Sequence, residues 1–328
     1  IEKALKGDRT SYCADDNSYY AHDRVLTTPF YTAYTRIGEG CSNRCTFCAI
    51  PLIRGAYRSR PEADVLAEIK QLAKQGVREH ILVAQDTTRY GEDLYGTYAL
   101  DSLIAELSQI EGIEWIRLLY AYPERITDDF IAAMAESRHI VHYLDMPIQH
   151  INDRVLKSMN RKGDRAAVES AVRRLRTAMP DITLRTTLLV GYPGETEAEF
   201  EELCDFVKSA RFERLGCFAF SAEEGTVAER MPNQIPEEIR QQRADAVMQL
   251  QTGIMAENQA ALVGREITVM CDDYDPEEDL FICRSAADAP DIDALCYVKS
   301  DETLEAGGMY RIRVEESDVY DLYGELAD

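Results

Sequence analysis

The chain alternates short apolar runs with amphipathic helical segments from residue 31 to residue 221. Apolar runs bounded by turn residues indicate buried strands, and apolar residues spaced three or four apart indicate helices. The predicted strands are 31–37, 80–86, 114–121, 141–150, 181–195 and 214–221, and the predicted helices between them are 59–77, 99–110, 126–137, 164–179 and 196–210. Strands joined by helical crossovers form a parallel sheet. No G-x-G-x-x-G follows the first strand, which argues against a dinucleotide-binding fold and favours a partial (β/α)6 TIM-like barrel.

Three of the predicted helices carry start signals in their sequence. Ser59 with Glu62, and Thr196 with Glu199, have the spacing of a capping box, in which each side chain bonds the backbone N–H of the other residue. Thr127 is expected to cap the helix at 126–137. These signals predict where each loop at a strand end gives way to its helix.

A long predicted helix at 235–262 separates the barrel from a region of different character. Short β segments follow it, EITVMCD, DLFICR, ALCYVK and MYRIRVEE, with turn clusters rich in Asp and Gly between them. Five or so short strands in this length predict a small, OB-like, all-β barrel. We therefore expect a polar lead-in at 1–30, the (β/α) barrel at 31–261 and the small barrel at 262–328.

The chain is strongly acidic, with a net charge of −23. Residues 262–328 hold 19 acidic and 5 basic side chains, a net charge of −14. Nucleic acid is a poor partner for such a surface, because binding requires that its phosphates be neutralised. A basic partner suits the surface better, although solubility alone is also a sufficient reason for the charge.

No run of 18 apolar residues and no apolar stretch typical of a signal peptide occurs in the sequence. Nine cysteines without a secretory signal indicate a reducing compartment, and we expect the cytoplasm. Four cysteines lie in apolar sequence contexts and are expected to be core thiols, namely Cys204, Cys217, Cys283 and Cys296.

Cys41, Cys45 and Cys48 form a C-x3-C-x2-C pattern in GEGCSNRCTFCAIPLIRG, directly after the first predicted strand. A structural zinc site closes with four ligands, and no fourth Cys or His is nearby in the sequence. Three thiolates can bind three irons of a [4Fe–4S] cluster and leave the fourth iron open, and an open metal position is typical of catalytic sites. Phe47 would shield one side of such a cluster. A zinc knuckle or a set of buried core thiols is the alternative interpretation.

Polar residues follow several predicted strands at the end where barrel enzymes hold their chemistry. They are Gln85 and Asp86, Gln149 and His150, and the segment from Gly191 to Glu195. The cysteine pattern falls at this same end, so we expect one shared site. Arg185 lies inside an otherwise apolar strand, and we expect it to face the barrel interior, toward a cofactor carboxylate.

The cysteine pattern in this setting resembles the radical S-adenosylmethionine enzymes. Within them, the chain is similar to the methylthiotransferase family in GCSNRCTFCAIPLIRGAYRSRP, ILVAQDTTRYG, LDMPIQHIND, MNRKG and LLVGYPGET. The PIQH segment and the acidic C-terminal region resemble the RimO type of this family. The resemblance covers nearly the whole chain, and the small barrel resembles a TRAM domain.

The resemblance implies a [4Fe–4S] cluster on Cys41, Cys45 and Cys48, with S-adenosylmethionine chelated to the open iron. It also implies a reaction, the addition of a methylthio group to the β-carbon of an aspartate in the small-subunit ribosomal protein S-twelve. Reduced flavodoxin or ferredoxin is the implied electron donor. The residues expected to bind the cofactor are Phe47, Gln85, Gln149, Arg185, Gly191 and Glu195. No general acid or base is assigned.

Two other functions remain open at this point. One is the methylthiolation of a modified adenosine in tRNA, although relatives that act on tRNA have basic TRAM domains. The other is a non-catalytic iron–sulfur or zinc module that binds a basic partner. The family also has an N-terminal domain whose three cysteines hold a second [4Fe–4S] cluster for sulfur insertion. Residues 1–30 contain only Cys13, so we expect the sequence to be a fragment that begins after that domain.

Overall fold

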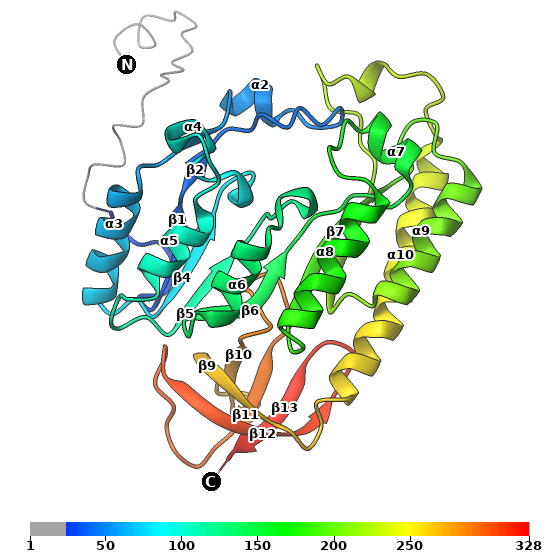
Figure 1. The fold of residues 1–328 in the computed structure, drawn as a ribbon. Coiled ribbons are helices and arrows are strands. Elements are labelled where there is room, and N and C mark those ends of the chain that lie inside the picture. The colour runs from blue at the N-terminus through cyan, green and yellow to red at the C-terminus, as the bar shows by residue number, and fades with distance from the viewer. Residues whose placement is uncertain (1–23, 328) are drawn as a thin grey trace, which may run out of the picture.

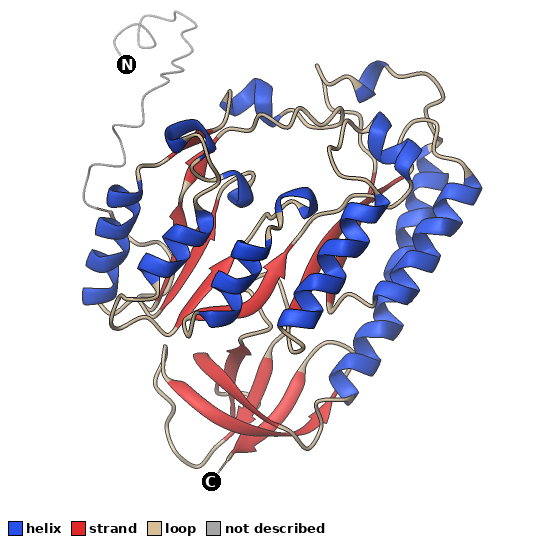
Figure 2. Ribbon diagram, viewed as in Figure 1, coloured by secondary structure: helices blue, strands red, loops and turns tan. Residues whose placement is uncertain are grey.

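Six parallel strands form the main sheet of the computed structural model. The structure describes residues 24–327, so most of the predicted lead-in at 1–30 lies outside the described residues. The strand order is β1-β4-β5-β6-β7-β8, and every neighbouring pair is parallel. The strands are β1 (Thr32–Arg36), β4 (Glu79–Val83), β5 (Trp115–Leu118), β6 (Ile140–Asp145), β7 (Thr183–Val190) and β8 (Arg214–Ala219). Figure 1 shows the chain passing from strand to helix along this sheet, and Figure 2 shows the helices gathered on its outer side. The predicted partial (β/α)6 barrel is confirmed.

The helices bury apolar stripes against the outer face of the sheet, in one continuous core. The longer ones are α3 (Glu62–Lys74), α5 (Leu100–Leu107), α6 (Asp128–Glu136), α8 (Arg165–Ala178), α9 (Glu197–Ala210) and α10 (Glu237–Ala260). Three short helices in the strand–helix loops were not predicted, namely α2 (Ile50–Arg54), α4 (Glu92–Tyr95) and α7 (Asp153–Ser158). None of the described helices is long and apolar enough to cross a membrane.

The predicted helix starts are right at two positions and wrong at one. The Thr127 hydroxyl accepts a hydrogen bond from the Phe130 N–H at 3.1 Å, and Thr196 with Glu199 forms the full capping box. Helix α3, in contrast, starts after Pro61 without a side-chain cap. Ser59 belongs instead to the short strand β3 (Arg58–Ser59), which pairs with β2 (Gly38–Glu39), and its hydroxyl donates to Asp93 at 2.6 Å.

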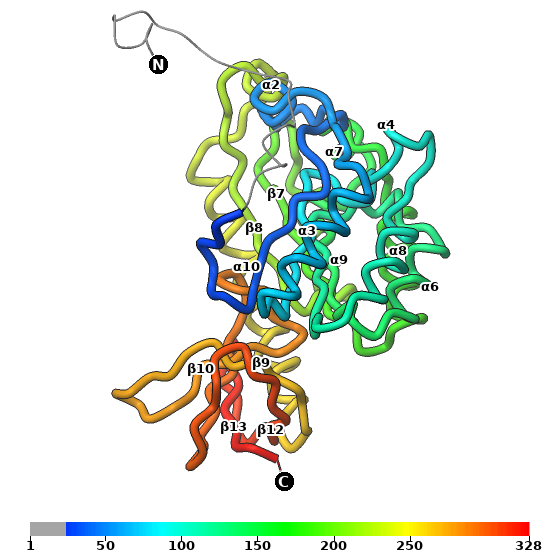
Figure 3. Tube along the Cα trace, turned by 90° about the vertical axis from the view of Figure 1, so that its left-hand side faces the viewer, coloured from blue at the N-terminus to red at the C-terminus, as the bar shows by residue number. Residues whose placement is uncertain are grey.

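Helix α10 leads into a closed five-stranded barrel in the order β10-β11-β13-β12-β9. Its strands are β9 (Glu266–Asp275), β10 (Leu280–Ser285), β11 (Cys296–Lys299), β12 (Met309–Ser317) and β13 (Leu322–Leu326). Cys283 and Cys296 are buried in its core, as predicted for core thiols, whereas Cys204 and Cys217 in the larger barrel are only partly buried. Figure 3 shows the small barrel stacked below the (β/α) barrel.

The two barrels meet at a buried, charged contact that we call the floor. It lies at the amino ends of the parallel strands. Glu79 at the start of β4 pairs with Arg117 of β5 at 3.1 Å and with Arg284 of β10 at 2.9 Å. The Tyr143 hydroxyl donates to Asp293 of the small barrel at 2.7 Å. Apolar side chains pack around these groups, among them Trp115, Leu119, Met270 and Ala289. The small barrel therefore closes the larger one from below and leaves the opposite end for the cysteine loop.

Candidate functional site

The cysteine loop, residues 38–55, runs from the end of β1 through β2 to helix α2. Figure 1 shows this region at the end of the barrel opposite the small barrel. Gly40 has a φ of 74°, and a Cβ added there would overlap the Ala56 carbonyl, so the two segments can approach only because residue 40 is glycine. The Cys41 N–H donates to the Gly55 carbonyl at 3.1 Å and closes the loop.

The segment that follows α7 holds the loop on both sides of Cys45. The Thr46 N–H donates to the Met159 carbonyl at 3.0 Å, and the Asn160 side-chain amide donates to the Arg44 carbonyl at 2.8 Å. Both Arg44 and Asn160 have positive φ values, 53° and 56°. One backbone bond and one side-chain bond therefore fix the residues on either side of Cys45, although α7 is more than 100 residues away in the sequence.

The three thiols of the loop are free, with Cys41 and Cys45 buried and Cys48 partly buried. Burial raises the pKa of the Cys41 and Cys48 thiols, so both must lose a proton when a metal binds. Nowhere in residues 24–327 do three Cys, His, Asp or Glu side chains lie close enough together to hold a single metal ion. A [4Fe–4S] cluster does not require this, because each thiolate binds a different iron. The donor set therefore fits such a cluster better than it fits zinc.

Asp86, one residue beyond Gln85, joins the cysteine loop to the barrel. Its Oδ2 accepts hydrogen bonds from Asn43 Nδ2 and from Arg125 Nη1, each at 2.8 Å. Arg125 also donates to Asn43 Oδ1 at 2.9 Å, and Thr88 donates to the other carboxylate oxygen at 2.7 Å. Because both oxygens are bonded and the side chain is fully buried, Asp86 positions the loop through Asn43.

Five of the six residues predicted to bind the cofactor lie at this end of the barrel. Gln85 follows β4, and its Oε1 is buried without a hydrogen-bond partner, as expected for a group that meets a ligand or water. Gln149 has a φ of 70°, and its N–H donates to the Thr187 carbonyl at 2.9 Å, which ties its loop to β7. Phe47 packs against an apolar group made of Val155, Met159, Tyr192, Phe220 and Ala228.

The remaining two, Gly191 and Glu195, form a tight turn after β7. Gly191 has a φ of 72°, and a Cβ there would collide with the Arg240 side chain of α10. Glu195 Oε2 accepts a hydrogen bond from the Gly191 N–H at 3.0 Å, and its Oε1 pairs with Arg243 at 2.7 Å. Burial raises the pKa of Glu195 although these bonds oppose the change. Glu195 therefore holds the shape of the turn, with both oxygens already bonded.

His150 lies buried behind this turn. Its Nδ1 accepts a hydrogen bond from the Asn152 N–H at 3.0 Å, and its Nε2 lies 3.7 Å from Glu195 Oε2. Burial lowers the pKa of His150 to about 4, so the ring is neutral at pH 7 with its proton on Nε2. The ring therefore has a structural hydrogen bond to the loop after β6, and its Nε2 is buried near Glu195 without a hydrogen-bond partner in the described chain.

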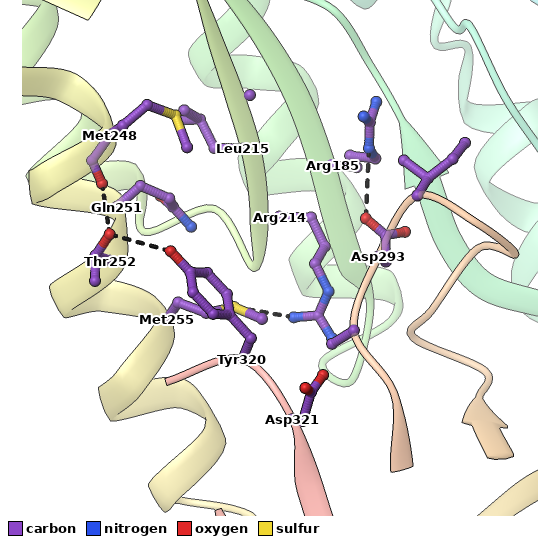
Figure 4. A pocket seen from close by; sticks show the side chains of 13 residues that line it. Arg185, Arg214, Leu215, Met248, Gln251, Thr252, Met255, Asp293, Tyr320 and Asp321 are labelled. Carbon is purple, nitrogen blue, oxygen red and sulfur yellow. Dashed lines mark hydrogen bonds and ion pairs between the residues drawn. The ribbon is translucent and has the colours of Figure 1, made fainter. Parts of the chain in front are cut away.

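Arg185, the sixth predicted residue, is the third residue of β7, and its side chain lies next to Asp293 of the small barrel (Figure 4). Its Nη1 donates to Asp145 at 2.9 Å, and its Nε lies 3.5 Å from Asp293 of the small barrel. Its partner Asp145 is the last residue of β6, and Asp145 Oδ2 also accepts a hydrogen bond from the Tyr120 N–H, in the loop after β5, at 3.3 Å. Two carboxylates pair with the Arg185 guanidinium, and its contact with the cofactor carboxylate stays a prediction.

Sequence reasoning did not single out three side chains that surround the loop, Tyr122, Arg125 and Arg161. The guanidinium of Arg161 lies 4.2 Å from the centre of the Tyr122 ring, and that of Arg125 lies 5.5 Å from it. Burial raises the pKa of Tyr122, and the nearby Cys45 and Cys41 add to this. Only Arg161 had a signal in the sequence, since it lies in the MNRKG stretch, and the other two follow β5 without any motif.

Comparisons with known proteins agree with this geometry. The Radical SAM superfamily model matches residues 35–207, and the TRAM domain model matches residues 263–327. The ribosomal protein uS12 methylthiotransferase RimO of Desulfitobacterium hafniense is 48% identical over 303 residues, which are 92% of this chain and 68% of that protein. The RimO of Pelotomaculum thermopropionicum is 47% identical over 330 residues, which are 99% of this chain and 74% of that protein.

Among solved structures, coproporphyrinogen III oxidase from Escherichia coli is similar with a TM-score of 0.49 and 17% identity, over 69% of this chain and 52% of that one. The sequence identities to the RimO proteins are far higher and extend over both barrels. One assignment agrees with the position of the cysteine loop at the carboxyl ends of the strands, with the presence of the small barrel and with the sequence identity to the RimO proteins. The chain belongs to the RimO family of radical SAM methylthiotransferases.

Proposed function

We propose that this chain carries the radical-forming and TRAM portions of an enzyme that adds a methylthio group to the β-carbon of an aspartate in ribosomal protein S12. The observation that supports this most strongly is the identity of 45–48% to several RimO proteins over most of the chain. We further propose that the division lies at residue 262, with the radical SAM domain before it and the TRAM domain after it.

The residues of the chain would each have a defined part in this reaction. Cys41, Cys45 and Cys48 would hold a [4Fe–4S] cluster. When bound, such a cluster supplies the electron that cleaves S-adenosylmethionine to a carbon radical, and this radical can remove hydrogen from an unactivated carbon. Phe47 would shield the cofactor from water on the loop side. Gln85 offers an unpartnered amide oxygen beside the same end of the barrel. We assign the turn at Gly191 to cofactor contact through its backbone.

The acidic small barrel supports a basic protein as the substrate. Part of its negative charge is used within the chain, because Asp288 pairs with Arg214 and Asp293 pairs with Arg185 at the floor. The other acidic residues are mostly exposed, including Glu277, Glu278, Asp291, Asp301, Glu302 and Glu305. Such a surface attracts a basic protein and repels RNA phosphates. We place the reaction in the cytoplasm, with reduced flavodoxin or ferredoxin as the electron donor.

Sulfur insertion requires more than the site described here. By resemblance to the family we propose a second [4Fe–4S] cluster, held by three cysteines of an N-terminal domain outside these 328 residues. In the described part of the chain, the remaining cysteines are Cys204, Cys217, Cys271, Cys283 and Cys296, none of which belongs to the cysteine loop. Hydrogen removal can be tested without that second cluster.

The decisive experiment follows hydrogen transfer from the substrate. The chain is reconstituted anaerobically with iron and sulfide, reduced with dithionite, and mixed with S-adenosylmethionine and S12 that carries deuterium at the β-carbons of its aspartates. We expect deuterium to appear in 5′-deoxyadenosine, measured by mass spectrometry. Cys45→Ala should abolish the transfer, and Cys204→Ala, which removes a thiol outside the loop, should leave it unchanged.

Two results would overturn the proposal. Formation of 5′-deoxyadenosine without deuterium, in the presence of bound S12, would show that the β-carbon is not the reacting position. Tight, salt-sensitive binding of tRNA, with no measurable binding of S12, would favour the tRNA-modifying alternative.

A further inference from the structure

We propose that Arg161 is a positioning residue of the cluster site, whose guanidinium bonds the Cys45 sulfur and stabilises the reduced cluster. The inference rests on the cluster of the proposed function, but it does not depend on the identity of the substrate. It gives a physical role to the MNRKG stretch, which the reaction outlined above leaves unexplained.

Three contacts fix the position of Arg161. Its N–H donates to the Leu156 carbonyl at 2.9 Å, which closes the C-terminal turn of α7. Its Nη2 donates to the Pro147 carbonyl at 2.7 Å, in the loop after β6. Its guanidinium lies over the ring of Tyr122, in the loop after β5, at 4.2 Å from the ring centre, which is a favourable cation–π distance. The backbone of Arg161 is thus fixed by α7, and its side chain is held by two other loops.

Cys45 lies at the point where these loops converge. The residues beside Cys45 are bonded to the two residues that precede Arg161, through the Thr46–Met159 and Arg44–Asn160 hydrogen bonds. These bonds hold the Arg161 segment against the Cys45 segment, and this geometry is the basis for assigning the guanidinium to the Cys45 sulfur. An arginine guanidinium keeps its proton at any pH at which the protein is folded, so Arg161 brings a full positive charge to this place.

A fixed positive charge at this place changes the energy of the two redox states by different amounts. Reduction adds one electron to a cluster whose thiolate ligands are already negative, so a nearby cation and a hydrogen bond to sulfur favour the reduced form. Arg125 contributes less, because its charge is matched by Asp86 at 2.8 Å. Within the described residues, the Arg161 side chain contacts the Pro147 carbonyl and the Tyr122 ring, and Glu124, whose negative charge also acts on it, lies beyond salt-bridge distance.

The test is a redox titration of the reconstituted 328-residue chain, followed by electron paramagnetic resonance without S-adenosylmethionine or substrate. The variants are Arg161→Met, which removes the charge, and Arg161→Lys, which keeps it. At the potential where the unchanged chain is half reduced, we expect the ratio of reduced to oxidised cluster in R161M to fall at least tenfold. That change equals a shift of about 59 mV for a one-electron couple. R161K should lie closer to the unchanged chain than to R161M.

Arg165→Met is the matched control, because Arg165 lies four residues further on and its ion pairs among the described residues are with the partly exposed Glu169 and Glu202. Its cluster should titrate as in the unchanged chain. The inference would be overturned if R161M had the same potential as the unchanged chain. It would also be overturned if R161M and R161K had equal potentials, both below that of the unchanged chain. Loss of iron from both variants with intact circular dichroism would also overturn it, since Arg161 would then be needed to hold the cluster. Failure of the unchanged chain to bind any cluster would instead overturn the proposed function.

Discussion

Replacement of Glu79 by glutamine tests whether the floor joins the two barrels into one cooperative unit. Glu79 is fully buried and lies between two guanidinium groups, Arg117 at 3.1 Å and Arg284 at 2.9 Å. After the substitution, Arg284 keeps its ion pair with Asp272, but Arg117 keeps no carboxylate partner in the described part of the chain and bonds only the Ala286 carbonyl there. Breaking a buried ion pair by removing one partner costs about 3–5 kcal/mol, because the other charge stays buried without compensation. We expect Glu79→Gln to lower the free energy of unfolding by that amount.

The chain offers a well-placed probe for this measurement. Trp115 is its single tryptophan, it is buried at the floor, and the Arg117 guanidinium lies 6.0 Å from its ring centre. Urea unfolding followed by Trp115 fluorescence should show a midpoint about 1 M lower for Glu79→Gln, at a slope of roughly 3 kcal/mol per molar urea. Asp205→Asn breaks an exposed pair with Lys208 and serves as the control, with an expected change below about 1 kcal/mol. A Glu79→Gln midpoint equal to that of the control would refute the reasoning.

The same substitution predicts a change in pH dependence. Burial by itself would raise the pKa of Glu79, but Arg117 and Arg284 outweigh it, and the pKa lies below the ordinary value of 4.5. As the pH falls, the unfolded chain therefore takes up this proton first, so the stabilisation is present above about pH 4.5 and is lost below it. Urea midpoints measured from pH 6 to pH 3 should fall less steeply in Glu79→Gln than in the unchanged chain, and equal slopes would contradict this assignment.

Three further changes address the cysteine loop and the turn after β7. Cys45→Ala should lose the iron and the visible absorbance of the reconstituted chain, and full iron retention would contradict the ligand assignment. Gly191→Ala should weaken S-adenosylmethionine binding by at least tenfold in equilibrium dialysis, because the added Cβ would collide with Arg240 and shift the turn. Unchanged binding would show that the turn is not part of the cofactor site. Thr196→Ala should lower the unfolding free energy by about 1 kcal/mol by removing the capping box with Glu199, measured by urea unfolding. A change near zero would mean that other groups satisfy the helix terminus.

The sequence by itself determined the order and type of the main elements. Apolar runs of strand length alternate with amphipathic helices, and this local pattern is sufficient to predict a parallel sheet, because each helix must cross from one strand to the next. The spacing of Cys41, Cys45 and Cys48 is also a local property, since all three lie in one loop. The start of α9 could be predicted because Thr196 and Glu199 are three residues apart.

Predictions failed where a distant partner competes with a local one. Ser59 has the spacing of a helix cap, but Asp93 takes its hydroxyl, because β3 pairs with β2 and places Ser59 in a strand. For Arg185, the sequence gives no sign that Asp293, more than 100 residues later, is a partner, although its contact with the cofactor stays a prediction.

Only the tertiary structure decided what surrounds the cysteine loop. Arg161, Tyr122 and Arg125 come from different loops, and they meet beside Cys45 because parallel strands bring all of their carboxyl-end loops to one edge of the sheet. The stacking of the small barrel under the larger one is decided in the same way, by buried ion pairs such as Glu79 with Arg284 that join residues 205 positions apart. A local pattern specifies which chemistry the chain can carry, and long-range contacts specify the charges that tune it.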